Sequence, residues 1–432
     1  MDQIALIHQA YLSSKGVSTD SRQNNLGFMF FALKGENFNG NKYVQEVLEN
    51  GAKYAVADDE SLKDIENVFI VNDVLTSLQE LAQYHRRFLN IPIIGITGTN
   101  GKTTTKELVA AVLSKKYVVS ATKGNFNNHI GVPLTILNMD KSIEIGVVEM
   151  GANHVGEIEI LCHIAEPNYG LITNVGKAHL EGFGSFEGVK TAKGELYQFV
   201  KQTNGKLFIN ADNPHLNKMA EGIVNRIEYG SSKGSVTGKI NTNSPFISIN
   251  WQTSNENKHL ISTNLIGAYN LENVLSAICV GLELGVSEED INTAIKTYTP
   301  TNNRSQFIQS GSNQIIMDAY NANPTSMQVA LQNFSETNAE NKVLILGGMK
   351  ELGQDCINEH KKLIKAIESI DTTRVLLIGD EFEFLKDNAN DMEVYPDTKS
   401  LIDGITKHPI YESYILIKGS RSNKLEEVLK YL

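Results

Sequence analysis

The sequence has few cysteines and no long apolar segment. Its 432 residues include a single tryptophan and three cysteines, Cys162, Cys279 and Cys356, none of them in a CxxC spacing. Such scattered thiols argue against a disulfide framework and are typical of free thiols in a reducing cytosol. No stretch approaches the ~18 apolar residues of a membrane-spanning helix, and the first residues, MDQIALIHQAYLSSKG, lack the regions of a signal peptide. We therefore expect a soluble, cytoplasmic protein without membrane insertion.

The chain also lacks an excess of positive charge. It has 39 Lys and Arg residues against 50 Asp and Glu residues, a formal net charge of −11 and a pI near 5.5. This balance argues against non-specific binding to nucleic acid, although local basic residues can still bind an anionic substrate. No apolar face obviously lacks a use within the chain, so we expect a monomer.

Alternating strand-like and helix-like segments predict an α/β protein of three domains, the number that ~150 residues per domain also suggests. Residues 1–88 form a small unit with apolar runs at 28–33, 54–57 and 68–71, which alternate with helical stretches near 42–50 and 74–89. Residues 89–300 begin with a strand at 91–96 and should form a mainly parallel sheet, with an antiparallel hairpin region at 235–266. Residues 301–432 contain four apolar runs that mostly end in glycine, which predicts a Rossmann-like, doubly wound domain. No G-x-G-x-x-G motif follows these strands, so binding of a dinucleotide is poorly supported.

The sequence IPIIGITGTNGKTTTKE predicts a phosphate-binding loop. A strand-like run is followed by Gly98-Thr99-Asn100-Gly101, and then by Lys102-Thr103-Thr104 at the start of an expected helix. Glycines let backbone N–H groups approach an anion, the helix N-terminus favours negative charge, and the lysine adds a mobile positive charge. The loop is shorter than the eight-residue Walker pattern, because Ile96 stands where that pattern has its first glycine. We expect an ATP-phosphate site in which the hydroxyl of Thr103 ligates Mg²⁺.

Other polar residues follow predicted strands and could meet at one edge of the sheet. Glu149 ends an apolar run, although an acidic residue there could also be a helix cap or a rim charge. Asn174, His179 and Glu181 follow the next run, and a lone histidine is more often structural than a ligand. Lys193 lies in a helix-like segment, where the residues alone favour a solvated lysine. The convergence of strand ends nevertheless makes a shared cleft plausible.

Nine motifs in one order resemble the Mur ligase family, the ATP-dependent amide-forming enzymes of bacterial cell-wall precursor synthesis. They are GTNGKT, GNFNNHIGVPLT, EMGANHVGEI, NVGKAHLEGFGS, AKGE, GAYNLEN, DAYNANP, GGMKELG and KGSRSNKLEEV, and they extend over essentially the whole chain. The N-terminal run STDSRQNNLGFMFFALKGENFNGNKY is similar to the UDP-sugar-binding domain of that family. The strongest similarity is to the member that adds D-alanyl-D-alanine to UDP-N-acetylmuramoyl-tripeptide.

The resemblance implies a role for each matching residue. Lys102, His179 and Lys193 would be catalytic, with Lys193 carbamylated so that its new negative charge supports a second metal. Thr103, Glu149, His179 and the Lys193 carbamate would face Mg²⁺, of which we expect two ions. The ATP-binding residues would be Gly98, Thr99, Asn100, Gly101, Lys102, Thr103, Thr104, Asn273, Arg304 and Asp318. The substrate-binding residues would be Ser21, Arg22, Asn127, Asn128, Tyr320, Asn321, Lys350 and Arg421.

The resemblance also implies the chemistry and its rivals. The tripeptide carboxylate would attack ATP to give an acyl phosphate, and the amine of D-Ala-D-Ala would then displace phosphate. One alternative is the preceding Mur ligase, which adds the third amino acid, but its DNPR-type motif is not found. A second is a folylpolyglutamate-synthase-like ligase, which lacks a UDP-sugar domain. A third is a non-catalytic scaffold, which is disfavoured because Lys102, Thr103, Glu149, His179 and Lys193 are all present.

Overall fold

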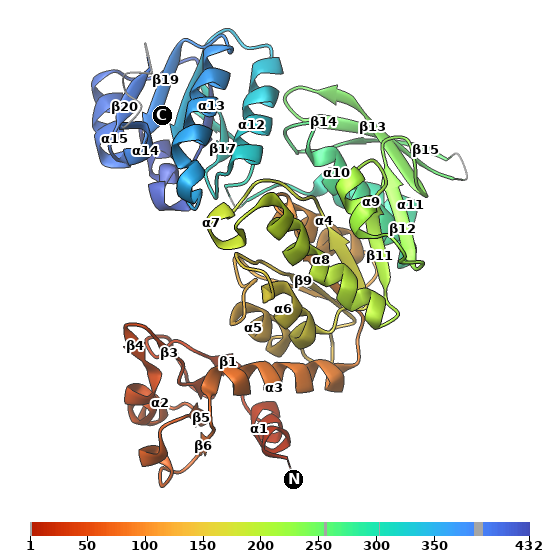
Figure 1. Cartoon of the computed structure of the whole chain (residues 1–432), viewed down its shortest axis with the longest axis vertical. Coiled ribbons are helices and arrows are strands. Elements are labelled where there is room, and N and C mark those ends of the chain that lie inside the picture. The colour runs from red at the N-terminus through yellow and green to blue at the C-terminus, as the bar shows by residue number, and fades with distance from the viewer. Residues whose placement is uncertain (1, 255–256, 302, 384–391) are drawn as a thin grey trace.

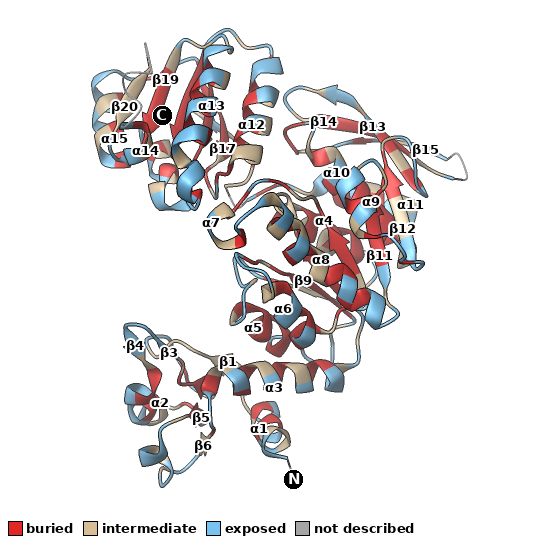
Figure 2. Ribbon diagram, viewed as in Figure 1, coloured by how far each residue is buried: buried red, intermediate tan, exposed pale blue. Residues whose placement is uncertain are grey.

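The computed structural model describes residues 2–254, 257–301, 303–383 and 392–432, and these form three α/β units (Figure 1). Each unit is built on its own sheet, of four, nine and six strands in chain order. The strands of the two larger sheets are mostly buried and their covering helices expose one side (Figure 2). No helix in the described part of the chain is long and apolar enough to cross a membrane.

The N-terminal unit has a parallel sheet in the order β1-β2-β5-β6 and a small antiparallel hairpin, β3-β4. Its strands are β1 (Val17–Ser18), β2 (Met29–Phe31), β3 (Lys34–Gly35), β4 (Phe38–Asn39), β5 (Tyr54–Ala57) and β6 (Val68–Ile70). Its helices are α1 (Gln3–Leu12), α2 (Val44–Glu49) and α3 (Val74–Leu89), with the 3₁₀ turns η1 (Gly40–Tyr43) and η2 (Glu60–Leu62). The predicted strands and the helix at 74–89 are thereby confirmed.

Helix α3 joins the N-terminal unit to the central one. Asp73 caps its first turn by accepting from the Thr76 N–H at 2.7 Å, and Asn90 ends it in the left-handed conformation. Its apolar residues Leu78 and Leu81 share one buried cluster with Ile136 and Leu161 of the central unit. Figure 1 shows α3 lying between the small sheet and helices α5 and α6. The first domain thus contributes part of the core of the second.

The central sheet has the order β15-β14-β13-β12-β11-β10-β7-β9-β8 and is parallel except around β14. Its strands are β7 (Ile93–Thr97), β8 (Val119–Ala121), β9 (Ile145–Glu149), β10 (Tyr169–Ile172), β11 (Lys206–Asn210), β12 (Arg226–Gly230), β13 (Val236–Asn243), β14 (Ile247–Thr253) and β15 (Lys258–Ser262). Its helices are α4 (Lys102–Leu113), α5 (Gly131–Leu137), α6 (Glu157–Ala165), α7 (Leu180–Phe183), α8 (Phe186–Gln202), α9 (Pro214–Met219), α10 (Asn270–Glu283) and α11 (Glu288–Thr297). The antiparallel pairs β13-β14 and β14-β15 confirm the hairpin region expected at 235–266.

Successive side chains of the central strands pack into two hydrophobic cores, one on each face of the sheet. Ile93 of β7 packs with α5, α6 and α8, whereas Ile94 packs with α4, α10 and α11. Period-two alternation in a strand sends successive side chains to opposite faces. Both faces are therefore covered by helices, and the polar groups at the strand ends are left at the edge of the sheet.

The C-terminal sheet has the order β16-β17-β21-β18-β19-β20, parallel except for the β16-β17 pair. Its strands are β16 (Gln306–Ser310), β17 (Asn313–Asp318), β18 (Lys342–Gly347), β19 (Arg374–Ile378), β20 (Glu393–Tyr395) and β21 (Tyr414–Lys418). Its helices are α12 (Pro324–Glu336), α13 (Cys356–Glu368), α14 (Asp380–Glu383) and α15 (Thr398–Lys407), with the 3₁₀ segments η3 (Gly353–Asp355), η5 (Arg421–Asn423) and η6 (Leu425–Tyr431). The four predicted strands are confirmed, whereas β16 and β20 were not among those predicted.

Candidate functional site

The site lies at the carboxyl edge of the central sheet, where strands β10, β7 and β9 are neighbours. The glycine-rich loop follows β7, Glu149 ends β9, and Thr173 and Asn174 follow β10. Because parallel strands end at the same edge, segments distant in sequence meet there. The predicted convergence of strand ends is confirmed.

Close packing explains the two glycines of the loop. Gly98 and Gly101 have φ angles of 142° and 78°. A Cβ on Gly98 would collide with the hydroxyl of Thr173, and a Cβ on Gly101 would lie 2.6 Å from Oδ1 of Asn273. Gly101 is also the N-cap of α4, so the loop opens into a helix N-terminus as expected. The loop therefore leaves no room for side chains at these two positions.

Lys102 turns back over the loop. Its Nζ donates to the carbonyl oxygens of Gly98 at 2.7 Å and Thr99 at 3.1 Å. Burial lowers the pKa of Lys102 to about 8, the Glu149 carboxylate opposes this shift, and the charge of Arg304 adds to it. An arriving polyanion would favour the charged lysine and replace these carbonyl contacts.

Thr103 and Glu149 form a buried oxygen pair beside the loop. The Thr103 hydroxyl donates to Oε2 of Glu149 at 2.8 Å, and Nδ2 of Asn127 donates to Oε1 at 2.8 Å. Glu149 is 1% exposed and Thr103 is 2% exposed. Both oxygens of this carboxylate are thus oriented by neighbours, which pre-organises it.

Lys193 is buried rather than solvated, contrary to the interpretation that its position in a helix alone favoured. It is 2% exposed, and its Nζ donates to the Ala152 carbonyl at 3.3 Å. Burial lowers the pKa of Lys193 to about 7, and the charge of Lys102 lowers it further, while Glu157 and Glu195 oppose the shift. A substantial share of neutral amine is therefore present near neutral pH.

His179 links the central unit to the C-terminal one. Its Nδ1 contacts a carboxylate oxygen of Glu351, and its backbone is left-handed, with φ of 50°. Burial lowers the pKa of His179, Glu351 opposes this shift, and the charges of Lys102 and Lys193 add to it. His179 therefore lies close enough to both lysines to sense their charges.

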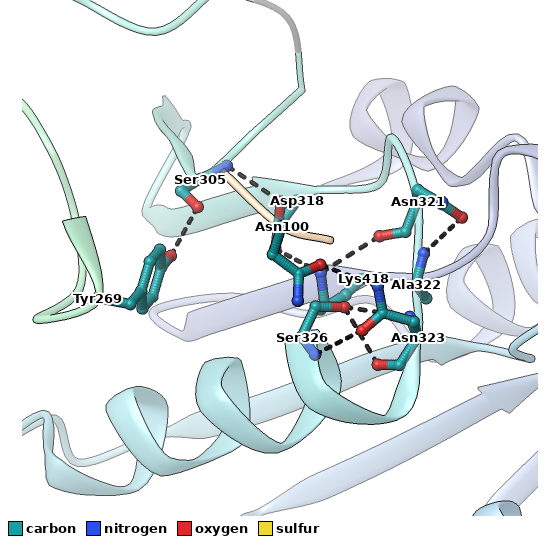
Figure 3. A network of polar contacts seen from close by, with 9 residues as sticks. All are labelled: Asn100, Tyr269, Ser305, Asp318, Asn321, Ala322, Asn323, Ser326 and Lys418. Atoms are coloured by element: carbon teal, nitrogen blue, oxygen red, sulfur yellow. Dashed lines mark hydrogen bonds and ion pairs between the residues drawn. The ribbon is translucent and has the colours of Figure 1, made fainter. Parts of the chain in front are cut away.

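The C-terminal unit contributes a network of hydrogen-bonded polar side chains (Figure 3). Lys418 donates to Oδ2 of Asp318 at 2.6 Å and to the Asn321 carbonyl at 3.3 Å. The Ser305 N–H donates to Oδ1 of Asp318 at 3.2 Å. The guanidinium of Arg304 stacks 3.7 Å from the centroid of the Tyr320 ring, a strong cation–π arrangement. Four predicted residues, Arg304, Asp318, Tyr320 and Asn321, thus lie together.

Some predicted residues have local partners. Asn273 accepts from the Thr105 hydroxyl at 3.1 Å and donates to Asn270 at 2.8 Å, so it supports the loop from beneath. The Asn128 side chain accepts from the Gly131 N–H at 2.8 Å and caps the start of α5.

Three other predicted substrate residues have acidic partners within their own units. Ser21 and Arg22 lie in the N-terminal unit, where Arg22 pairs with Asp20 at 2.8 Å. In the C-terminal unit, Lys350 pairs with Glu381, and the exposed Arg421 pairs with Glu426 at 2.8 Å.

Two residues with evident structural roles at the site were not predicted. Glu157 accepts from the N–H groups of Asn153 at 2.6 Å and His154 at 3.1 Å, and so fixes the loop that follows Glu149. Asn323 caps α12 and contacts the phosphate loop. The capping role could have been read from Asn323-Pro324 before a helix-like run, but its contact with Asn100 has no sequence signal.

Three family models match consecutive parts of the chain. They are "Mur ligase family, catalytic domain" over residues 13–94, "Mur ligase middle domain" over 96–281, and "Mur ligase, glutamate ligase domain" over 303–421. The UDP-N-acetylmuramoyl-tripeptide–D-alanyl-D-alanine ligase of Bacillus subtilis strain 168 is 35% identical, over 96% of this chain and 93% of its own length. The chain belongs to the Mur ligase family.

Solved Mur ligases share the whole architecture. MurF from Acinetobacter baumannii superposes with a TM-score of 0.88 at 29% identity, covering 99% of this chain and 97% of that one. MurF from Thermotoga maritima, solved in complex with ADP, gives 0.86 at 27% identity and covers 97% of each chain. The predicted family and three-domain α/β class are confirmed.

The described residues of this Mur ligase contain no group of three or more His, Cys, Asp or Glu side chains able to hold a metal ion. A magnesium ion bound with a nucleotide does not require such a cluster. It keeps several water ligands, binds phosphate oxygens and uses only one or two protein carboxylates. The buried Thr103 hydroxyl and Glu149 carboxylate are hard oxygen donors adjacent to the phosphate loop. These residues fit a magnesium ion bound with ATP.

Proposed function

We propose that this Mur ligase adds D-Ala-D-Ala to UDP-N-acetylmuramoyl-tripeptide, using ATP, to give the UDP-linked pentapeptide, ADP and phosphate in peptidoglycan precursor synthesis. It would then be an ATP-dependent acid–D-amino-acid ligase. The observation that carries this proposal is the similarity, over almost the whole chain, to UDP-N-acetylmuramoyl-tripeptide–D-alanyl-D-alanine ligases. The phosphate loop and the buried Lys193 support it. Fold alone would not distinguish one amide-forming ligase from another.

The chemistry proceeds in two steps. A carboxylate oxygen of the tripeptide forms a bond to the γ-phosphorus of ATP, the bond to the bridging oxygen of ADP breaks, and an acyl phosphate results. The amine of D-Ala-D-Ala then attacks the acyl carbon, the C–O bond to phosphate breaks, and the amine proton leaves to solvent or a base. Both steps bring anions together, so the protein acts by positioning and by neutralising charge.

Within the proposal, the loop residues 98–104 bind the ATP phosphates and Lys102 neutralises the γ-phosphate. Thr103 and Glu149 would hold Mg²⁺, which would supply charge neutralisation when bound. Arg304 and Asp318 bind the nucleotide, with Asn273 supporting the loop. His179 lies beside the reacting groups, and its contact with Glu351 orients it.

Lys193 is proposed to become a carbamate. Its neutral amine forms an N–C bond to CO₂ and loses one proton to solvent, which converts a neutral group into an anion. The lowered pKa of Lys193 supports this step, because only the unprotonated amine is nucleophilic. The product would give the site a second anionic group for a second Mg²⁺.

The same proposal assigns one ligand to each domain. Residues 1–88 would bind the UDP-sugar, residues 89–300 ATP, and residues 301–432 the incoming dipeptide. Ser21, Arg22, Asn127 and Asn128 would bind the UDP-linked substrate. Tyr320, Asn321, Lys350 and Arg421 would bind the intermediate or the incoming dipeptide. We further propose a cytoplasmic monomer that binds no nucleic acid.

The test measures phosphate release from Mg-ATP with UDP-N-acetylmuramoyl-tripeptide, with and without D-Ala-D-Ala. Release that requires both substrates, with a pentapeptide product by mass, is the expected result. Turnover of a UDP-dipeptide with a free amino acid would instead indicate the preceding Mur ligase, and turnover of folate with glutamate would indicate the folylpolyglutamate-type enzyme. Binding of the UDP-tripeptide without phosphate release would favour a scaffold.

A further inference from the structure

Asn100 is the point at which the phosphate loop contacts the C-terminal domain. Its Oδ1 accepts from Nδ2 of Asn323 at 2.8 Å, across 223 positions of sequence. Its backbone is held within the central domain, since its N–H donates to Oδ1 of Asn174 at 3.0 Å and its carbonyl accepts from Thr173 at 2.6 Å. The side chain is thus free to be positioned by the other domain.

Asn323 is itself rigidly held. It is the N-cap of α12, where its Oδ1 accepts from the Ser326 N–H at 2.8 Å and its own N–H donates to the Ser326 hydroxyl at 3.1 Å. Pro324 follows at the first helical position, and Asn323 is 8% exposed. Because the capping box uses the oxygen of the amide, the nitrogen is left to point at Asn100, as Figure 3 shows.

A second contact runs in parallel through the loop after β10. The hydroxyl of Thr325 accepts from the Lys177 N–H at 3.2 Å, and a Cβ on Gly176 would come within 2.9 Å of that hydroxyl. The Gly176 N–H in turn donates to the Thr99 hydroxyl at 2.9 Å. The N-terminal end of α12 therefore contacts the phosphate loop directly through Asn323, and indirectly through the segment Gly176–Lys177.

We propose that Asn323 is a positioning residue for the phosphate loop, and that docking of the C-terminal domain through Asn323 holds Asn100 in the conformation that receives the nucleotide phosphates. The inference rests on the proposed ATP site. Coupling of this kind is reciprocal, so nucleotide binding also tightens the contact between α12 and the loop. Asn323 acts through Asn100 and is not assigned a contact with the reacting atoms.

The variant N323S separates this role from helix capping. Serine caps helices about as well as asparagine, so α12 keeps its cap, but the shorter side chain cannot reach Asn100. N100A removes the other end of the same hydrogen bond. N333S is the matched control, since Asn333 lies on the same helix and accepts from Asn243 of the central domain at 3.3 Å, away from the phosphate loop.

The measurement is the Kd of ADP for the full-length protein by isothermal titration calorimetry, with thermal unfolding to verify folding. We expect N323S and N100A each to weaken ADP binding by about three- to tenfold, as the loss of one hydrogen bond implies. The double variant should be no weaker than N100A alone, because both changes break one contact. N333S should bind ADP as the unmodified protein does.

The steady-state prediction is a raised KM for ATP in N323S with an unchanged KM for the UDP-linked substrate. Unchanged ADP affinity in N323S, equal weakening in N333S, or additive losses in the double variant would each overturn the inference. Failure of the proposed function is separately visible, because the unmodified protein would then bind ADP but form no pentapeptide, or would bind no ADP at all.

Discussion

The hydroxyl of Thr103 donates to Oε2 of Glu149 at 2.8 Å, so the first turn of α4 and the end of β9 share one buried hydrogen bond. The two residues are 46 positions apart: Thr103 lies in the helix that follows β7, and Glu149 ends β9, the strand that pairs with β7. At the proposed magnesium site these two oxygens would be available to the cation, and the Thr103 proton would no longer point at Glu149. The pair is therefore already assembled before ATP arrives, which reduces the reorganisation that binding requires.

This relationship predicts opposite outcomes for two conservative changes at Thr103. T103S retains a hydroxyl and should keep most activity, whereas T103V retains the shape and loses the oxygen. We expect T103V and Glu149→Gln to lower kcat/KM by ~100-fold or more, the scale seen when one charge-stabilising group is removed. Phosphate release at several Mg²⁺ concentrations is the measurement. Equal activity of T103S and T103V would contradict the assignment of this hydroxyl.

The burial of Lys193 predicts chemical rescue. Lys193→Ala should abolish pentapeptide formation, because it removes the amine proposed to carry the carbamate and leaves space beside Ala152. Short carboxylates such as formate or acetate should then restore part of the activity by supplying the missing anion. Lys201→Ala, at an exposed position of the same helix, is the control and should neither lose activity nor respond to carboxylates. Failure of carboxylates to rescue Lys193→Ala would contradict an anionic role for Lys193.

The sequence predicted those parts of the site that are formed by residues close together in the sequence. The glycines of the loop, Lys102 and Thr103 are recognisable because strand, turn and helix follow one another within a short segment. Glu149 was identifiable from its place at the end of an apolar run, because parallel strands expose their last residues at one edge. The burial of Lys193 was not evident from its helix, since the residues that desolvate it come from other segments; only the family resemblance indicated it.

Contacts between side chains of different domains, and two short or edge strands, were beyond prediction. The bond from Asn323 to Asn100 and the contact of His179 with Glu351 join different domains, and no periodicity marks either partner. Strand β20 has only three residues, and β16 lies at the edge of its sheet, so neither forms a long apolar run. Helix α3 was predicted within its true bounds, but its packing on α5 and α6 depends on tertiary structure.

The lowered pKa of Lys193 predicts a gain in stability when the lysine is removed. The unfolded chain holds this proton up to pH about 10.5, whereas the folded chain releases it near pH 7. The buried charge therefore opposes folding fully below pH 7, and the cost disappears as the pH rises toward 10.5. Lys193→Met should raise the unfolding free energy by up to ~5 kcal/mol at pH 6 to 7.

Urea unfolding in bicarbonate-free buffer without Mg²⁺ would measure this gain. It should shrink steadily between pH 7 and 9, and Lys201→Met should show no comparable pH-dependent gain. A gain that is constant with pH would mean that packing, rather than charge, separates the variant from the unmodified protein. The expected pH-dependent gain would instead show that stability and function are in conflict at this position, as is common where a site requires a buried charge.

A histidine pair predicts acid sensitivity where the N-terminal helices dock on the central domain. Nε2 of His8 lies 3.0 Å from Nδ1 of His85, and His85 and Tyr11 in turn bond the carbonyls of Met139 and Leu137 at 2.8 and 2.6 Å. Burial, with a smaller contribution from His85, lowers the pKa of His8 to about 4. The unfolded chain binds this proton from about pH 6.5 downward, so stability should fall as the pH drops from 6.5 to 4.

Replacing His8 should remove part of that loss. We expect His8→Leu to reduce the decrease in unfolding free energy between pH 7 and pH 5 by about 1–2 kcal/mol, since leucine fills the aromatic surroundings without taking up a proton. Circular dichroism during urea unfolding at the two pH values is the measurement. His129→Leu, at an exposed position, is the control and should leave the pH dependence unchanged. An unchanged acid response in His8→Leu would place the sensitivity at other groups, such as His85, whose pKa burial also lowers.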